Sequence, residues 1–281
     1  MTSVASVSAT MYNDDFTDGV NPTLFQSQQT VPATQGNVQY LETGAGLSVD
    51  TTPSFTESGT RGGTFVPFNG YGPLSQDWYV IAHAFIPSKT PFIPALENVS
   101  TLSSPRAPEV ALSLGAINEQ RQGIDDLGIE HTVNYNGSST EYRRFSDLKL
   151  NGVNDASSTQ TDTPGVDDVY LAITYDFATD TLTTLFSETG GAISGFTPDL
   201  VVTDLKQKFK QADGTTPLTD ANVLLITLTG FTDVFVEGGS NEQYWVSFES
   251  DGLILVPEPS TYGMLTGLIA LTGAALWRRR R

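Results

Sequence analysis

Short runs with strand periodicity, separated by clusters of Gly, Pro, Asn and Asp, most constrain how this chain can fold. The strongest run covers residues 77–87, where apolar side chains occupy both sets of alternate positions. Because successive side chains of a strand point to opposite faces, such a strand must be covered on both faces. We therefore expect 77–87 to be a central, buried strand.

Two pairs of runs lie on either side of short turns and predict β-hairpins. Residues 127–135 and 141–150 flank Asn136-Gly137, a dipeptide typical of tight hairpin turns. Residues 168–177 and 181–187 flank a second short turn. The other expected strands are 11–16, the hairpin 37–42 and 46–50, 63–67, 109–116, 221–229, 233–237, and 244–256, whose residues 244, 246 and 248 share one face.

Helical spacing is scarce in the first 255 residues. Apolar residues recur near the helical period within 200–211, where Thr203 or Asp204 is placed to cap a helix and lysines favour its C-terminal end. Segments 88–107 and 151–166 are rich in Ser, Thr, Pro and Asn, and we expect them to be exposed loops.

Twelve or thirteen strands without alternating helices predict an all-β fold. The architecture that we expect is an antiparallel β-sandwich of the jelly-roll type, formed as one domain by residues 11–255. Hydrophobic residues make up 38% of the chain, which is enough for a real core, and only 16% are charged. This composition is typical of an extracellular β-protein.

The charge and the absence of cysteine exclude several classes of function. Taking the four terminal arginines and Glu258 from the 14 basic and 32 acidic residues leaves a net charge of −21 for residues 1–256. Such a domain repels nucleic acid and anionic lipid, so nucleic acid is not an expected partner. A chain with no cysteine has no disulfides, thiolate metal sites or cysteine nucleophiles.

The last 26 residues have the pattern of a targeting signal and a membrane anchor. Pro257, Glu258 and Pro259 end any preceding strand, because proline removes a ladder hydrogen bond. The uncharged apolar run 262–277 predicts a transmembrane helix of about 24 Å, short against a hydrocarbon core of about 30 Å. The run is followed by Arg278, Arg279, Arg280 and Arg281, a strong membrane stop on the cytoplasmic side.

These three parts, within residues 256–281, resemble the PEP-CTERM sorting signal of Gram-negative bacteria. The resemblance implies export, anchoring in the inner membrane, and processing by an exosortase-type membrane protease. The protein would then reach the cell surface or the extracellular polysaccharide matrix. An ordinary tail anchor, which would leave a periplasmic domain on the inner membrane, is the alternative reading.

Export also requires a signal peptide. Residues 1–10 have no basic start and no long apolar stretch. We therefore expect these residues to be a residual or mis-started segment, with the true signal peptide encoded upstream.

A second resemblance concerns the main domain. The segment Asp14-Asp15-Phe16-Thr17-Asp18-Gly19 and the hairpin over 170–183 are similar to parts of concanavalin A-like domains, which include laminin-G and legume-lectin-like jelly rolls. This similarity implies a structural, adhesive or carbohydrate-binding β-sandwich. A glycan-active hydrolase on the same fold is the competing class.

The residues give little support to the hydrolase. A glycosidase needs two carboxylates flanking the scissile bond, and Glu130, Glu237, Glu242 and Glu249 are not spaced to provide them from one strand. No Gly-x-Ser-x-Gly nucleophile elbow occurs, and both histidines lie in expected strands. We expect no catalytic residues and a domain that is not an enzyme.

Few residues are candidates for binding calcium or a sugar, although the chain is rich in acidic residues. Calcium takes six to eight oxygen ligands, and the candidates for such a site are Asp147, Asn151, Asn154 and Asp155, with Asp125-Asp126 as a second choice. The alternative for all of these is solvated turns, and no other cofactor is expected. The aromatic residues available to a sugar are Tyr71, Tyr135, Tyr142 and Trp245, the last of which is expected in the core.

Overall fold

The computed structural model describes residues 10–17, 29–31, 39–43, 46–50, 62–85, 106–116, 125–135, 140–161, 168–211, 213–232 and 242–255. The first nine residues, the Pro257-Glu258-Pro259 motif, the apolar run 262–277 and the arginines 278–281 lie outside the described residues. Within the described part of the chain, no helix has the length and apolar character needed to cross a membrane.

The described strands form two antiparallel sheets that share β15. Sheet A contains, in spatial order, β1 (Thr10–Asp14), β15 (Glu242–Leu255), β6 (Trp78–Phe85), β11 (Asp168–Asp176), β12 (Thr181–Ser187) and β13 (Thr197–Val202), and the hairpin of β3 (Gln39–Thr43) and β4 (Gly46–Asp50) pairs with the start of β15. Sheet B contains β10 (Val153–Thr161), β9 (Thr140–Leu150), β8 (Asp126–Tyr135), β7 (Arg106–Ala116), β14 (Val223–Thr232) and β5 (Gly62–Pro73), with β2 (Gln29–Val31) on β5.

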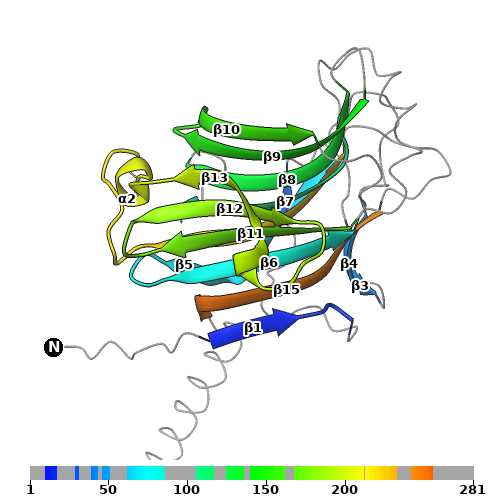
Figure 1. The fold of residues 1–281 in the computed structure, drawn as a ribbon, viewed down its shortest axis with the longest axis horizontal. Coiled ribbons are helices and arrows are strands. Elements are labelled where there is room, and N and C mark those ends of the chain that lie inside the picture. Colours follow the sequence, from blue (N-terminus) through cyan, green and yellow to red (C-terminus); the bar gives the residue numbers. More distant parts are fainter. Residues whose placement is uncertain are drawn as a thin grey trace, which may run out of the picture.

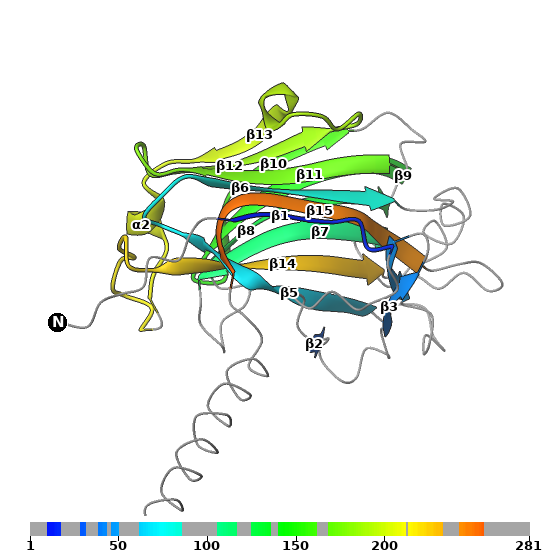
Figure 2. The same cartoon turned by 90° about the horizontal axis from the view of Figure 1, so that it is seen from below.

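The two sheets pack face to face as the layers of a sandwich (Figure 1 and Figure 2). Strand β11 contacts β7 and β8, β12 contacts β8, and β13 contacts β9 and β10. One apolar core fills the space between the sheets, and its fully buried members include Val80 and Leu171 from sheet A and Leu112 and Ile129 from sheet B. Because burying one such side chain contributes about 1.5–3 kcal/mol, this core dominates the stability of the domain.

Strand β15 crosses from one sheet to the other at Gly252. Up to Asp251 it pairs with β6, and Ile254 and Leu255 pair with β5. Gly252 has a φ of +78°, and a Cβ there would lie 2.4 Å from the carbonyl oxygen of Asp77. Only glycine therefore fits at this crossing.

Strand β6 confirms the expectation of a central buried strand. It lies between β15 and β11. Val80, Ala82 and Ala84 point into the core, while Ile81 is 7% exposed in a second apolar cluster on the outer face of sheet A. The expected hairpins are also confirmed, because β3 pairs with β4, β8 with β9, and β11 with β12.

The expected helix over 200–211 is wrong for most of its length. β13 continues to Val202, and the helix α2 comprises only Leu205–Lys208. A hydrogen bond from the backbone N–H of Leu200 to the hydroxyl of Thr184 helps hold this segment against β12. Asp204, one of the two expected caps, is the N-cap residue of α2, but it adopts a left-handed conformation and makes no side-chain capping bond.

Two further expectations about strands are corrected. Segment 151–166 is not all loop, because β10 runs antiparallel to β9 at the edge of sheet B. β5 extends from Gly62 to Pro73, well beyond the expected 63–67. The expected strand 233–237 lies outside the described residues, and β2 and β13 were not anticipated.

A bulge corrects the expected facing of residues in β15. The pairing with β6 shifts between Trp245 and Ser247. Trp245 and Phe248, three residues apart, are both fully buried, whereas Val246 is only partly buried. An extra residue on the bulged strand accounts for this spacing. The expectation that 244, 246 and 248 share one face is therefore wrong, and Trp245 is a core residue as expected.

Candidate functional site

The outer face of sheet B presents polar side chains from two neighbouring strands. In β9, Ser146 and Leu148 point inward, the first to Thr184 of sheet A and the second into the core. Because side chains alternate along a strand, Asp147 and Lys149 point outward. The hairpin register of β8 and β9 therefore decides which groups lie beside them.

Two carboxylates and one ammonium meet on this outer face, and we name Asp126, Asp147 and Lys149 the acid–lysine cluster. Asp126 pairs with Lys149 across the hairpin, and Gly128 pairs with Asp147. The Lys149 Nζ lies 3.2 Å from Asp147 Oδ2 and 3.8 Å from Asp126 Oδ1. The side chain of Lys149 is 35% exposed, that of Asp126 16% and that of Asp147 7%.

The environment of the acid–lysine cluster changes how it titrates. Burial raises the pKa of Asp126 to about 6, and the charges of Asp147 and Asp125 add to the rise while Lys149 opposes it. Burial lowers the pKa of Lys149, but the neighbouring carboxylates of Asp126 and Asp147 outweigh burial, so the net pKa is raised. Lys149 therefore stays an ammonium at neutral pH, and Asp126 exchanges its proton just below neutrality.

Small residues form the surface around the cluster. A Cβ on Gly128 would lie 3.3 Å from the Ser113 hydroxyl and 3.5 Å from Asp147 Oδ1. Ser113 pairs with Gly128, and the alternate positions of β7 on this side are Ala111 and Gly115. None of these three β7 residues is charged, so the charged groups of this surface come from β8 and β9.

Asp125, next to the cluster, has a structural role. Its Oδ1 accepts a hydrogen bond of 2.7 Å from the backbone N–H of Asn151, and its Oδ2 accepts one of 3.0 Å from that of Lys210. The side chain is buried. Asp125 thus ties the β9–β10 turn and the segment after α2 to the start of β8.

The residues considered for calcium are only partly brought together. Asp147 faces Lys149 and joins Asp126, which was the second choice for the site. Asn151, Asn154 and Asp155 are exposed in the following turn and in β10. Over the described ranges, no group of three or more His, Cys, Asp or Glu residues is arranged to hold a metal ion. The calcium site stays a prediction.

Both histidines lie in strands, as expected. His83 in β6 stacks on Tyr170 at 3.9 Å between ring centroids and bonds to Asp168. His131 in β8 is fully buried near Phe186 of β12. Tyr71 is partly buried, and the side chains of residues 135 and 142 lie outside the described set.

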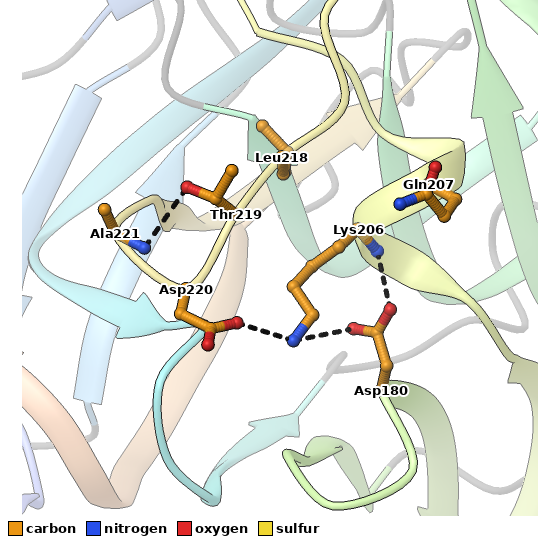
Figure 3. Close-up of a pocket in the computed structure, with 7 residues that line it drawn as sticks. All are labelled: Asp180, Lys206, Gln207, Leu218, Thr219, Asp220 and Ala221. Atoms are coloured by element: carbon orange, nitrogen blue, oxygen red, sulfur yellow. Dashed lines mark hydrogen bonds and ion pairs between the residues drawn. The ribbon is translucent and has the colours of Figure 1, made fainter.

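A pocket of about 510 Å³ opens at the end of the sandwich that carries α2 (Figure 3). It is lined by Asp180, Lys206, Gln207, Leu218, Thr219, Asp220 and Ala221. The Lys206 Nζ donates to Asp220 Oδ1 at 2.8 Å and lies 3.9 Å from Asp180 Oδ1. Asp180 also accepts hydrogen bonds from the Tyr175 hydroxyl and the Lys206 backbone N–H, each 3.0 Å long.

Sequence reasoning named neither Lys149 nor the pocket. The signal for Lys149 was its place two residues after Asp147 in an expected strand, which puts both on one face. The pocket had no such signal, because its residues come from three separate segments: the β11–β12 turn, α2, and the loop of residues 218–221.

No protein-family model matches the sequence, and no curated protein matches it. Peanut lectin, solved with a nine-residue peptide, is 13% identical, and the match covers 89% of this chain and 100% of the lectin at a TM-score of 0.51. The winged bean acidic lectin in complex with methyl-α-D-galactose is 12% identical over 88% of this chain and 99% of the lectin, also at 0.51. These similarities show that the chain has the antiparallel, lectin-like jelly-roll fold, as the second resemblance predicted.

Proposed function

We propose that the β-sandwich binds a neutral glycan on the outer face of sheet B, at the acid–lysine cluster. The observation that carries this proposal is the Lys149 ammonium beside the Asp126 carboxylate on a surface of small side chains. Neighbouring hydroxyls of a sugar both donate and accept hydrogen bonds, and this pair offers an acceptor and a donor side by side. Charged partners make such bonds stronger than neutral ones.

The net charge narrows the class of glycan. Residues 1–256 carry a charge of −21, which follows from the sequence composition. A field of that sign repels polysaccharides rich in carboxylate, sulfate or phosphate groups. Neutral chains, or chains with cationic groups, are therefore the ligands that the domain would tolerate.

A retaining glycosidase is the second candidate function, because Asp126 has a pKa of about 6 close to a second carboxylate. In such enzymes one carboxyl group protonates the leaving oxygen while the other attacks the sugar. Here the Lys149 ammonium lies between Asp126 and Asp147, where the sugar would have to enter. This arrangement favours binding over hydrolysis.

The proposed location follows from the C-terminal residues. We propose that the chain is exported, anchored by 262–277 in the inner membrane, and processed by an exosortase-type protease near Pro257-Glu258-Pro259. Its glycan-binding domain would then lie at the cell surface or in the extracellular matrix. Mass spectrometry of the exported protein tests this, and a mature form that still ends at Arg281 would contradict processing.

A glycan array, probed with and without calcium, tests the binding proposal. We expect binding to neutral glycans to fall at least tenfold in Lys149→Gln and Asp126→Asn, which is about 1.4 kcal/mol. Lys208→Gln on α2 is the control for Lys149→Gln, because it changes the net charge in the same way. Undiminished binding in both cluster variants would place the glycan elsewhere, and release of reducing sugar by the wild type would revive the hydrolase.

A further inference from the structure

The pocket at the end of the sandwich has an unbalanced charge. Asp180 and Asp220 are carboxylates, and Lys206 supplies one ammonium between them (Figure 3). Among the described residues, no other charged side chain lines the pocket. The lining therefore carries one net negative charge, so a ligand with a positive group would balance it.

The two carboxylates differ in how much of their bonding capacity is used. Both oxygens of Asp180 accept hydrogen bonds within the protein, from Tyr175 and from Lys206. In Asp220, Oδ1 accepts from Lys206, whereas Oδ2 has no hydrogen-bond partner among the described residues. The Asp220 side chain is 61% exposed. Asp220 is therefore the carboxylate that can receive a cationic group.

The pocket also offers hydrogen-bond donors, and an aromatic ring lies beside it, against Lys206. Within the described part of the chain, the Gln207 side-chain amide has no hydrogen-bond partner, and Lys206 has a third N–H in addition to those facing the two carboxylates. The ring of Phe177 is 38% exposed and lies 5.0 Å from the Lys206 Nζ. Its backbone is fixed by a 2.8 Å hydrogen bond from the Phe177 N–H to Asp77 Oδ1.

We propose that this pocket binds a protonated amino sugar, as a second subsite of the glycan-binding domain. The inference rests on the proposed glycan-binding function and extends it to a cationic sugar. Asp220 would accept from the sugar ammonium, Lys206 and Gln207 would donate to hydroxyl oxygens, and Phe177 would cover an apolar face of the ring.

The mixture of groups favours an amino sugar over a polyamine and over a neutral sugar. A polyamine would use the carboxylate and the ring, but it would have no acceptor for the donors of Lys206 and Gln207. A basic peptide has backbone carbonyl acceptors, so oligolysine is included as a competing probe in the test below. A neutral sugar would leave the net charge unbalanced. An amino sugar uses all of these groups together.

The pocket is also physically joined to the acid–lysine cluster. The segment after α2, which supplies pocket residues, is hydrogen-bonded through the Lys210 N–H to Asp125. Asp125 directly precedes Asp126 in the chain. Both sites therefore belong to the same end of the sandwich, where one glycan chain with mixed neutral and cationic residues can use them.

Titration calorimetry of the full chain tests the proposal with three probes: glucosamine oligomers, the fully N-acetylated oligomers, and oligolysine. We expect glucosamine oligomers to bind at least tenfold more tightly than the N-acetylated form, and to weaken when the amine is deprotonated at higher pH. Asp220→Asn and Phe177→Leu should each weaken their binding about tenfold, whereas the matched control Glu188→Gln should leave it unchanged. Circular dichroism verifies that each variant is folded.

Each alternative outcome has a definite meaning. Equal binding of the N-acetylated oligomers, or no effect of Asp220→Asn, overturns the amino-sugar site. Tighter binding of oligolysine would make the pocket a site for basic peptides and also overturn it. Lys149→Gln separates the two proposals, because it should weaken neutral-glycan binding at least tenfold while leaving the Asp220-dependent binding of a single glucosamine intact. If neutral-glycan binding or glucosamine binding is absent while the other is present, the absent one shows which proposed site has failed.

Discussion

Asp199 offers the sharpest test of what holds the two sheets together beside the acid–lysine cluster. Its side chain on β13 is only 2% exposed. It accepts hydrogen bonds from the hydroxyls of Ser146 in β9, at 2.6 Å, and Ser158 in β10, at 3.1 Å. The Arg144 Nε lies 3.5 Å away, and the Arg144 guanidinium stacks over Phe186 at 3.9 Å. One carboxylate of sheet A thus binds two strands of sheet B.

We expect Asp199→Ala to lower the free energy of unfolding by about 3–5 kcal/mol, the usual cost of removing one partner of a buried ion pair. Each hydrogen bond to a charged group alone contributes about 1.5–3 kcal/mol. The contacts do not simply add, because they share one carboxylate. Asp199→Asn keeps an acceptor oxygen and should lose less, about 1–3 kcal/mol.

Urea denaturation followed by tryptophan fluorescence measures these changes, since Trp78 and Trp245 are buried. The dependence of the unfolding free energy on urea should keep its slope, which shows that the same surface is exposed on unfolding. Asp155→Ala in the exposed part of β10 is the control, and its effect should stay within about 0.5 kcal/mol. A loss of less than about 1 kcal/mol in Asp199→Ala would refute the role of Asp199 as a buried link between the sheets, because a loss of that size is expected of an exposed ion pair.

Three further predictions concern pH and backbone conformation. The pKa of Asp126 is about 6 in the folded protein and lower when unfolded. Ionisation of Asp126 therefore destabilises the folded protein increasingly as the pH rises towards 6. Asp126→Asn should remove this cost, so it should stabilise the fold by up to about 3 kcal/mol at pH 7 and hardly at all at pH 3.5. Urea titrations at both pH values measure the difference. Lys149→Met removes the charge that lowers the pKa of Asp126, so a carboxyl NMR titration should place that pKa above 6. Gly252→Ala brings a Cβ to 2.4 Å from a backbone oxygen, whereas Gly152→Ala, at a similar φ of +75°, meets no atom within 4 Å. Backbone strain alone lowers the free energy of unfolding by about 1–3 kcal/mol, so Gly252→Ala should lower it by more than Gly152→Ala does. Equal melting temperatures of the two variants would contradict the clash.

The buried strands could be predicted because their periodicity reports burial directly. In β6 both sets of alternate residues are apolar apart from His83, and the strand has neighbours on both edges and apolar groups on both faces. The edge strand β10 could not be recognised in this way. Its Ser and Thr residues resemble a loop, yet Ser158 is satisfied by Asp199 from the other sheet. A polar residue in an edge strand is interpretable only once its partner across the sandwich is known.

The contact between Asp126 and Lys149 could not be predicted from the sequence either, because it depends on the register of the β8–β9 hairpin. A two-residue turn at Asn136-Gly137 would pair Asp126 with Asp147, placing two carboxylates opposite each other. In the structure Tyr135 pairs with Thr140, which moves Lys149 opposite Asp126. A shift of two residues keeps every side chain on its face, so the hydrophobic pattern does not distinguish the two registers. The contact between opposite charges is favourable, whereas opposed like charges destabilise a strand pair.

Strand β9 connects the packing of the sandwich to its proposed function. Its inward residues Ser146 and Leu148 are fixed by Asp199 and by the core. The outward residues Asp147 and Lys149 alternate with them along the same strand, so their backbone positions are set by contacts on the other face. The Asp147 carboxylate, buried beneath Lys149, then holds the ammonium in place before any ligand arrives. Because Lys149 is already ordered, its side chain loses less conformational entropy when a glycan binds than a free lysine side chain would.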